Sequence, residues 1–311
     1  MRRVRDERGA VAVMVALLLV PLMGFAAIGV DVAGMWSEHQ QLQNGADAGA
    51  LAIAQNCGRG ACGDTAGTAQ QLASANHVGP GAGASVVSLG ASEVTVRATA
   101  TRAHFFAPVL GIKSSQLSAQ ATAGWGSPSG GTAVLPLAFS WCEWKQQTVN
   151  GLPSGTTERV IYLTKSSGTT DCTGPSNNIV PGGFGWLTVN SGTCGTRTSI
   201  ADTIYSDPGN SVPNGCSTTD FSSLIGTTVL LPLFDSSAGT GSSANYHLYG
   251  YAAFRLTGYS FGGQYSEGTS TCKGSARCVK GYFTSFVDLT EAFTYSAGAP
   301  ALGTSVIELT S

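Results

Sequence analysis

The sequence predicts an α+β fold. A long N-terminal membrane-spanning helix with an amphipathic extension and a small β unit precede a disulfide-stapled all-β distal domain. No residue is charged between Gly9 and Val30. Small and apolar residues then recur at steps of three and four as far as Ile53, which is a helical spacing. Beyond residue 131, short apolar runs alternate with turns rich in Gly, Ser, Thr and Asn, a pattern typical of strands.

The composition excludes nucleic acid as a partner. Of the 311 residues, 42% are hydrophobic and only 11% are charged, whereas about a quarter are charged in an average soluble domain. The net charge is −2, so the chain lacks the basic field that would hold a phosphate backbone. The length suits two folded units, at roughly 100–200 residues per domain.

The uncharged run has the length of a membrane anchor. It covers 22 residues. A helix needs about 20 residues to cross a bilayer, whereas the core of a cleavable signal takes roughly 7–15. We therefore expect a retained transmembrane helix over residues 9–32, with a removed signal cut after Ala27-Ile28-Gly29 as the alternative. Gly29 and Ala33 share a helix face, which indicates either a seat for a neighbouring helix or ordinary small-residue content.

The charges that flank the run predict its orientation. In segment 1–8, four arginines oppose only Asp6 and Glu7: Arg2, Arg3, Arg5 and Arg8. Positive flanks stay in the cytoplasm, so segment 1–8 is the expected cytoplasmic flank. The protein is then a single-pass protein of the cell membrane whose C-terminal domain is extracellular. Trp36 lies just beyond the outer end, where an indole suits the lipid headgroup layer.

The cysteines agree with export. All eight follow the anchor: Cys57, Cys62, Cys142, Cys172, Cys194, Cys216, Cys272 and Cys278. An even number outside the cell indicates disulfides. Zinc is the rival interpretation, but it favours closer pairs than these and clustered histidines. Eight cysteines allow about 105 pairings, so connectivity stays open. The short spacing of Cys57/Cys62 and of Cys272/Cys278 favours local closure, which leaves the other four within the distal domain.

Residues 33–125 are expected to hold the helical extension and a small β unit. The helical spacing continues the anchor helix to Asn56, and a second helix is expected over Thr65–Ala75. The stretch from residue 76 to 85 has the composition of a turn-rich break. Residues 91–103 alternate between apolar and polar side chains, which predicts a half-buried strand. An apolar bridge or short helix at residues 104–112 and another alternating run complete the unit.

The remaining chain is predicted to be a separate β domain. Residues 126–131, GSPSGG, have the composition of a flexible linker. In residues 132–311 the apolar runs are AVLPLAFSW, ERVIYLT, FGWLTVN, TTVLLPLF, YHLYGYAAFRLTGYSF and GYFTSFVDL. The sequence shows no amphipathic helix of useful length between them. This pattern favours a sandwich or a barrel.

Three N-terminal motifs point to a known family. They are Arg8-Gly9-Ala10 before the apolar run, Gly29-Val30-Asp31-Val32-Ala33 at its exit, and LQNGADAGALA over residues 42–52. This segment resembles the N-terminal region of TadG-like (TadE/TadG-like) proteins of the Tad (Flp) pilus assembly system. The run at residues 94–123, with its FFAPVLG bridge, is similar to the family's continuation. The distal runs PGGFGWL and GYAAFRLTGY resemble TadG-related proteins of Gram-positive bacteria.

The resemblance implies a non-catalytic role in assembling or anchoring a Tad/Flp pilus or a related secretion machine. It implies a pilin-like helix with a small β-sheet unit over residues 33–125. The implied partners are membrane lipid and other membrane proteins of that machine, contacted through the N-terminal helix. Pilins of the system are cut after a glycine, with a glutamate five residues into the mature chain. A cut after Gly9 would place Met14 there, so we expect no prepilin-type cleavage.

We expect no catalytic residue, cofactor-binding residue or metal ligand. The run from Asp235 to Gly239 resembles the D-x-S-x-S metal motif of some TadG proteins, but a glycine replaces its second serine. Ser260 lies in a G-x-S-x-G match that lacks the following helix a nucleophile elbow needs, so we interpret the match as a turn. Glu143 and Glu158 are either an acid/base pair or ordinary exposed carboxylates. The tryptophans form either a sugar-binding face or buried packing: Trp125, Trp141, Trp144 and Trp186.

Two alternative functions remain open at the level of sequence. The same anchor could carry a surface adhesin or a cell-wall ligand-binding domain. An exported hydrolase that uses Ser260 is the other alternative, and it is the weaker because no histidine follows His247 in the chain.

Overall fold

The computed structural model describes most of the chain, which divides into two compact units. The described residues are 8–79, 81–164, 169–200, 202–205, 211–239, 244–268, 272, 275–288, 292–296 and 298–310. Unit 1 comprises Met1–Ile53, Gly63–Ala123 and Leu309–Ser311, and unit 2 comprises Ala54–Cys62 and Gly124–Glu308. The charges of the predicted cytoplasmic flank that precede Arg8 lie outside the described residues: Arg2, Arg3, Arg5, Asp6 and Glu7.

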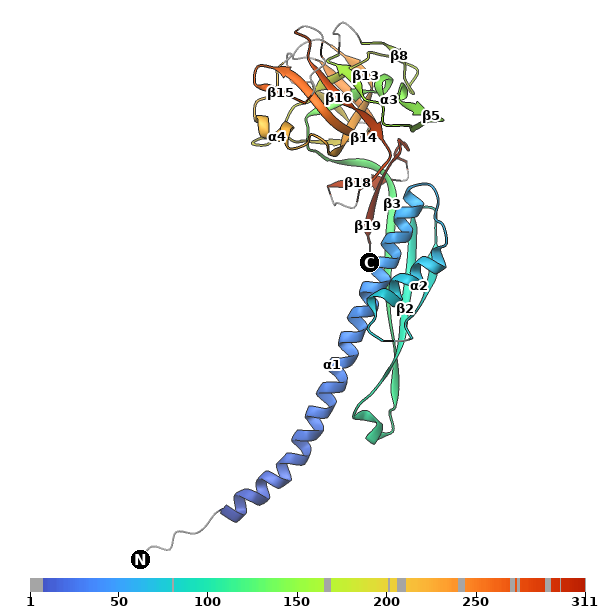
Figure 1. The fold of residues 1–311 in the computed structure, drawn as a ribbon, viewed down its shortest axis with the longest axis vertical. Helices are drawn as coiled ribbons and strands as arrows, with labels where there is room; N and C mark the ends of the chain where they lie inside the picture. The colour runs from blue at the N-terminus through green and yellow to red at the C-terminus, as the bar shows by residue number, and fades with distance from the viewer. Residues whose placement is uncertain are drawn as a thin grey trace, which may run out of the picture. The chain divides into compact units, whose positions relative to one another are not determined.

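Helix α1 (Arg8–Gly58) is a single continuous helix of 51 residues, drawn in blue in Figure 1. At 1.5 Å per residue it is about 76 Å long. The predicted continuation of the anchor helix into its extension is therefore confirmed. From residue 11 to residue 30 every position is exposed except Ala27, which is half-buried. Pro21 lies inside this apolar stretch, and membrane helices tolerate proline better than soluble ones.

The second half of α1 is buried on one face only. Buried residues recur along it at Glu38, Leu42, Ala46, Ala50 and Ile53, which are helical steps. This amphipathic half packs within unit 1 against the rest of that unit. The change from exposure all round to burial on one face begins at Asp31, which is only 6% exposed.

Helix α2 (Thr65–Asn76) packs on α1 through small residues. It begins at Asp64, whose side chain accepts a hydrogen bond from the Gly67 amide at 2.9 Å and caps the helix. A Cβ on Gly45 of α1 would lie 2.9 Å from the Cα of Ala73. One turn along, a Cβ on Gly49 would lie 3.5 Å from the Cα of Ala69. Glycine at these positions lets the two backbones approach closely, so residues of the ADAGA run have a packing role in unit 1.

The sheet of unit 1 is antiparallel where β1 (Gly83–Leu89) pairs with β2 (Glu93–Ala103). In strand order, β3 (Ser114–Ala133) follows β2. The alternation predicted for β2 is confirmed, because Val94, Val96, Ala98 and Ala100 are all buried. The expectation of a turn-rich break up to residue 85 is wrong at its end, where β1 begins. Most of β1 is exposed or half-buried, so its sequence carries no strong apolar alternation.

The predicted flexible linker is instead part of strand β3. Residues 127–131 pair with β18 (Phe293–Ser296), and residues 130–133 pair with β11 (Thr196–Ser199). A Cβ on Gly126 would lie 2.8 Å from the ring of Tyr295, and one on Gly131 only 2.4 Å from a neighbouring carbonyl oxygen. These glycines therefore permit close contacts between strands. Composition alone cannot distinguish this use of glycine from flexibility.

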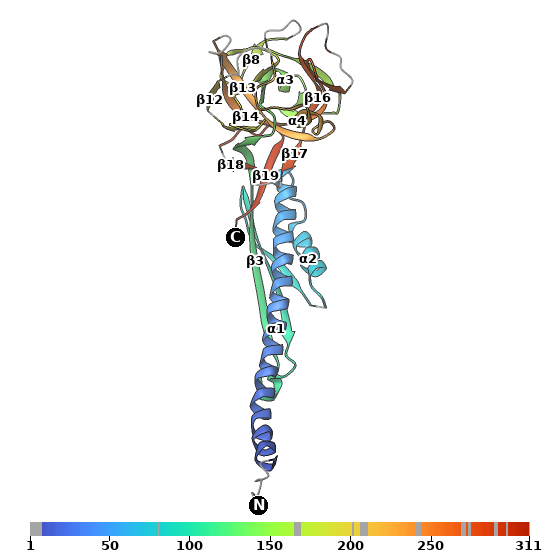
Figure 2. The same cartoon turned by 90° about the vertical axis from the view of Figure 1, so that its left-hand side faces the viewer.

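A barrel forms the core of unit 2. Its strands are β4 (Leu137–Ser140), β7 (Arg159–Tyr162), β10 (Phe184–Trp186), β13 (Thr228–Ala238), β14 (Asn245–Gly262) and β16 (Cys278–Thr284). They pair in the order β10-β4-β13-β14-β16-β7. A parallel bridge between Leu163 and Phe184 joins the two ends, so the sheet closes on itself. Figure 2 shows the strands of unit 2 curving around a common centre. Of the two predicted architectures, sandwich or barrel, the structure has the barrel.

Shorter elements complete the two units. Helices α3 (Trp141–Lys145) and α4 (Thr218–Ser222) are single turns, and η1 (Ala107–Leu110) is a 3-10 turn in unit 1. The remaining strands are β5 (Thr148–Val149), β6 (Leu152–Pro153), β8 (Cys172–Thr173), β9 (Ile179–Val180), β12 (Thr203–Tyr205), β15 (Tyr265–Gly268), β17 (Phe286–Asp288) and β19 (Thr304–Leu309).

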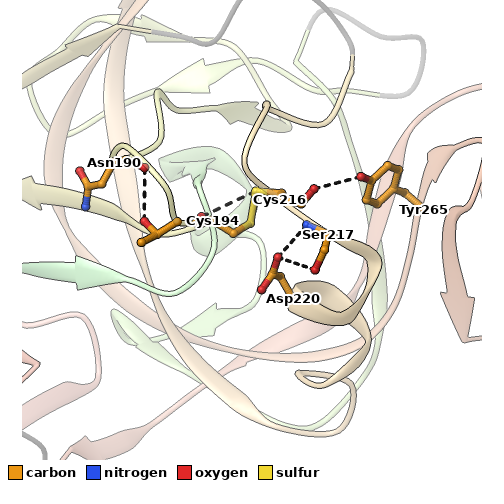
Figure 3. The surroundings of a disulfide bond; sticks show 7 residues. Asn190, Cys194, Cys216, Ser217, Asp220 and Tyr265 are labelled. Carbon is orange, nitrogen blue, oxygen red and sulfur yellow. Dashed lines mark hydrogen bonds between the residues drawn. A yellow bond between two sulfur atoms is a disulfide. The ribbon is translucent and has the colours of Figure 1, made fainter.

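All eight cysteines form disulfides within unit 2. The pairs are Cys57–Cys62, Cys142–Cys172, Cys194–Cys216 and Cys272–Cys278. The two closely spaced pairs close locally, as the spacing favours. Figure 3 shows how hydrogen bonds secure the segment beside one bridge. The Tyr265 hydroxyl donates to the Cys216 carbonyl at 3.0 Å, and Asp220 accepts from the Ser217 amide at 2.6 Å. The bridges and these bonds fix the loops between short strands.

Candidate membrane anchor and its attachment to unit 1

The first half of α1 is apolar and exposed on all sides. Its best 18-residue window has a mean hydropathy of 2.7, and none of that window is buried within the structure. A helix in the core of a soluble domain would be covered by other elements, which this one is not. A water-exposed cylinder of Leu, Val, Met and Phe is strongly unfavourable, and a bilayer removes that cost. The length, composition and exposure of this one N-terminal helix suggest the class of protein, a single-pass membrane protein.

Asp31 attaches the exit of the membrane helix to the β2–β3 connection. Its two carboxylate oxygens accept three backbone hydrogen bonds: from Phe105 at 2.7 Å, from Phe106 at 3.0 Å and from Ala107 at 2.8 Å. These amides open the 3-10 turn η1, where they have no backbone acceptor within a helix. A buried carboxylate that accepts several amides is well compensated. Asp31 therefore joins two segments of unit 1 that are more than seventy residues apart.

Glu38 makes the second attachment, two turns further along α1. One of its oxygens lies 3.1 Å from His77 Nε2, and the other accepts from Arg102 Nη1 at 3.0 Å. Burial raises the pKa of the Glu38 carboxyl, but the hydrogen bonds from His77 and Arg102 outweigh burial and hold that pKa below its usual value. The ionised form is thus favoured in the fold. A Cβ on Gly34 would lie 2.4 Å from Arg102 Nη2, so glycine leaves room for the guanidinium.

Two glutamines extend this row of contacts. Gln41 accepts from the Val78 amide at 2.7 Å, and Gln43 donates to the Gln120 carbonyl at 3.2 Å. The polar contacts of α1 thus reach the end of α2, strand β2, strand β3 and the β2–β3 connection. The membrane helix is not a tether followed by a free domain. It is a structural element of unit 1.

Acid is expected to weaken unit 1 through Glu38. A lowered folded-state pKa means that its contacts contribute fully above the unfolded value near 4.5, and that this contribution is lost as pH falls through the folded-state pKa. At neutral pH, Glu38→Gln should cost about 1 kcal/mol, a low value because Arg102 is partly exposed and screened. Denaturant titrations of the detergent-solubilised full chain, monitored by amide exchange in α2, measure the free energy of unfolding of unit 1. The difference in this free energy between the wild type and Glu38→Gln should become smaller in acid. An equal difference at neutral and at acidic pH would contradict this role.

The sequence-derived catalytic candidates are not assembled into a site. Ser260 lies within β14, paired with Ser266 and Cys278, and not at a strand-to-helix turn. The G-x-S-x-G match, residues 258–262, therefore lies wholly within a strand, and its interpretation as a turn is wrong. His247 lies on the same strand, and thirteen intervening steps of about 3.3 Å keep it far from Ser260.

The two glutamates have separate environments. Glu143 is 6% exposed and accepts from the Gly183 amide at 2.8 Å, and burial raises its pKa in spite of that bond. Glu158 pairs with Lys280 at 2.7 Å. Of the four tryptophans considered for a sugar-binding face, Trp125, Trp144 and Trp186 are buried and Trp141 is half-buried. The structure thus favours buried packing over a sugar-binding face.

Asp235 has partners of its own. It is fully buried in β13 and accepts from Ser176 Oγ, while its other oxygen lies 2.8 Å from His247 Nδ1. The serine bonds the carboxylate and not the imidazole, so the three do not form a relay in which histidine takes the serine proton. Among the residues that the structure describes, no three His, Cys, Asp or Glu side chains gather as a metal site.

Comparison with known protein families also points to the N-terminal helix. A family model described as "Putative Flp pilus-assembly TadE/G-like" (Tad) matches residues 9–56. No curated protein and no solved structure matches the chain. The matched segment is α1 almost from end to end, so the resemblance seen in the sequence is confirmed there. Together with the apolar helix, the match supports a membrane protein related to pilus assembly.

Proposed function

We propose that this protein is a non-catalytic, single-pass membrane protein that assembles or anchors a Tad/Flp-type pilus or a related secretion machine. The observation that carries the proposal is that the matched family segment coincides with the membrane-spanning helix and its polar attachments to unit 1. The arginine-rich start favours a cytoplasmic N-terminus. Four disulfides, all after the span, support an extracellular location for the rest.

The span itself offers a surface for a neighbouring membrane helix. A shallow apolar groove runs along one face of α1, lined by Val15, Leu18, Leu19, Leu22, Met23 and Ala26. Gly29 and Ala33 continue this face at helical steps, and nothing lies within 4 Å of a Cβ on Gly29. Small residues at such steps let two membrane helices pack closely. This supports lateral association with other membrane proteins of the machine through the N-terminal helix.

The test combines complementation with analysis of the native N-terminus. Deletion of the gene should abolish pili in electron micrographs, and the wild-type chain should restore them. The double variant Gly29→Leu/Ala33→Leu should fail to restore them although it still reaches the membrane. Gly24→Leu, on the opposite side of the helix, is the matched control and should succeed.

Three outcomes would contradict the proposal. Unchanged pili after deletion would remove the assembly role. A new N-terminus at Ala10 in sheared filaments would make the chain a filament subunit. A new N-terminus near Val30 in the culture fluid would make it a secreted protein.

A further inference from the structure

The β2–β3 connection of unit 1 ends in an exposed apolar loop, here called the apolar tip (residues 105–112). Phe105 is 71% exposed, Phe106 49%, Val109 90% and Ile112 53%. Single exposed apolar residues are common, but four in an eight-residue loop are not ordinary surface. In Figure 1 this loop is the turn between β2 and β3 that lies beside α1.

Asp31 fixes the depth of the apolar tip relative to the membrane. The uncharged run ends at Val30, and its 22 residues span about 33 Å, close to the roughly 30 Å of a hydrocarbon core. Asp31 is therefore at the boundary between hydrocarbon and headgroups. Its three hydrogen bonds hold the amides of residues 105–107 at that same level.

Most backbone amides of the apolar tip donate hydrogen bonds within the protein. Asp31 accepts from the amides of residues 105–107, and residue 108 is a proline without an amide hydrogen. Within the loop, Val109 donates to Phe106 at 3.1 Å, Gly111 to Pro108 at 3.0 Å and Ile112 to Ala107 at 3.2 Å. Irregular backbone is costly in lipid because its polar groups lose water, and these bonds remove most of that cost.

Basic residues flank the apolar tip on both strands. Arg102 is the penultimate residue of β2, and its guanidinium pairs with Glu38 and lies 5.8 Å from the centre of the Phe105 ring. Lys113, which is exposed, precedes β3. Apolar and aromatic side chains beside the exposed Lys113 match the order of layers at a membrane surface, where a cation meets lipid phosphates.

We propose that the apolar tip inserts into the outer leaflet of the membrane beside the span. The occupant of this apolar surface is lipid, because the surface is continuous with the exit of the membrane helix and lies at its depth. The chain then contacts the bilayer at two points. A single helix can rotate and tilt freely, whereas two rigidly joined contacts fix the rotation and tilt of unit 1 against the membrane plane. This inference rests on membrane anchorage and extends beyond the proposed role in assembly.

The experiment places one nitroxide label on the full chain in vesicles of phosphatidylcholine and phosphatidylglycerol at about 3:1, a mixture with anionic headgroups. The test variant is Val109→Cys and the matched control is Val78→Cys, because both valines are highly exposed, at 90% and 85%. The Val78 amide bonds Gln41, ten residues and about 15 Å beyond Asp31 along α1. A count of one free thiol verifies that the native disulfides remain paired.

Collisions with oxygen and with a water-soluble nickel chelate then report depth. At Val109 we expect oxygen collisions to rise and chelate collisions to fall by about three-fold or more relative to Val78, as for a site in hydrocarbon. Equal chelate access at the two sites would overturn the inference. Shielding of Val109 from both reagents would also overturn it, because a protein would then cover the tip. A chain that fails to float with the vesicles would refute membrane anchorage itself, which separates the two failures.

Discussion

Asp31→Ala should release the β2–β3 connection from the membrane helix. The three amides that Asp31 holds at 2.7–3.0 Å would lose their acceptor in a site where the replaced side chain is 6% exposed. Unpaired buried amides are costly, so the loop should open. We expect the exchange rates of the residue 105–107 amides to rise by about 100-fold, since each tenfold corresponds to about 1.4 kcal/mol in the opening equilibrium.

Two further variants make this result specific. Asp31→Asn keeps one acceptor oxygen but places an amide NH2 group against a backbone donor. Its effect on the exchange of these amides should therefore lie between those of the wild type and Asp31→Ala. Asp47→Ala removes an aspartate of the same helix that accepts a hydrogen bond from Gln43 at 2.8 Å. It should leave the exchange of the loop unchanged. Hydrogen exchange by mass spectrometry on the detergent-solubilised full chain measures all three. If Asp31→Ala leaves the loop as protected as in the wild type, the attachment is not needed.

Phe139→Ala should destabilise the barrel of unit 2 more than any surface change. Phe139 is fully buried, and its ring lies 4.9 Å from that of Phe254, 5.6 Å from that of Phe283 and 6.0 Å from that of Phe184. It lies on β4, which pairs with strands on both sides. Truncating such a side chain removes apolar contacts and leaves a cavity, which typically costs 3–5 kcal/mol, so we expect a loss of about 4 kcal/mol.

The control for this prediction is Phe139→Leu. Leucine keeps much of the volume and the apolar character, so the loss should be about 1–2 kcal/mol. Denaturant titrations of the oxidised full chain in detergent, followed by near-ultraviolet circular dichroism, report the aromatic core. Equal midpoints for the alanine variant and the wild type would contradict the central place of this cluster.

The elements that could be predicted from sequence are those with a clear period. The apolar run and its helical continuation defined α1, and the alternation of Val94, Val96, Ala98 and Ala100 defined β2. Strand β1 was missed because its outward position gives it no apolar alternation. The glycines of β3 resembled a linker because close packing and flexibility favour the same residue. The choice of a barrel depends on the bridge between Leu163, which follows β7, and Phe184 of β10, which no local pattern specifies.

The contacts that attach α1 to unit 1 could be predicted only in part from the sequence. The sequence marks Asp31 as the end of the uncharged run and marks residues 104–112 as apolar, but it does not show that the two meet. The available signal for this contact is an acidic residue directly after a span, together with an apolar loop far along the chain. Glu38 carries no motif at all. Its role depends on His77 and Arg102, which only folding brings together.

Closure of the barrel has a consequence for association between copies of the chain. Each of its six strands has a neighbour on both sides, because the bridge at Leu163 and Phe184 joins the first to the last. In the described chain this ring has no terminal strand, which reduces the open edge onto which a foreign strand could add. Copies at high local concentration would thus be less prone to polymerise through these strands, and recognition would depend more on side chains and loops.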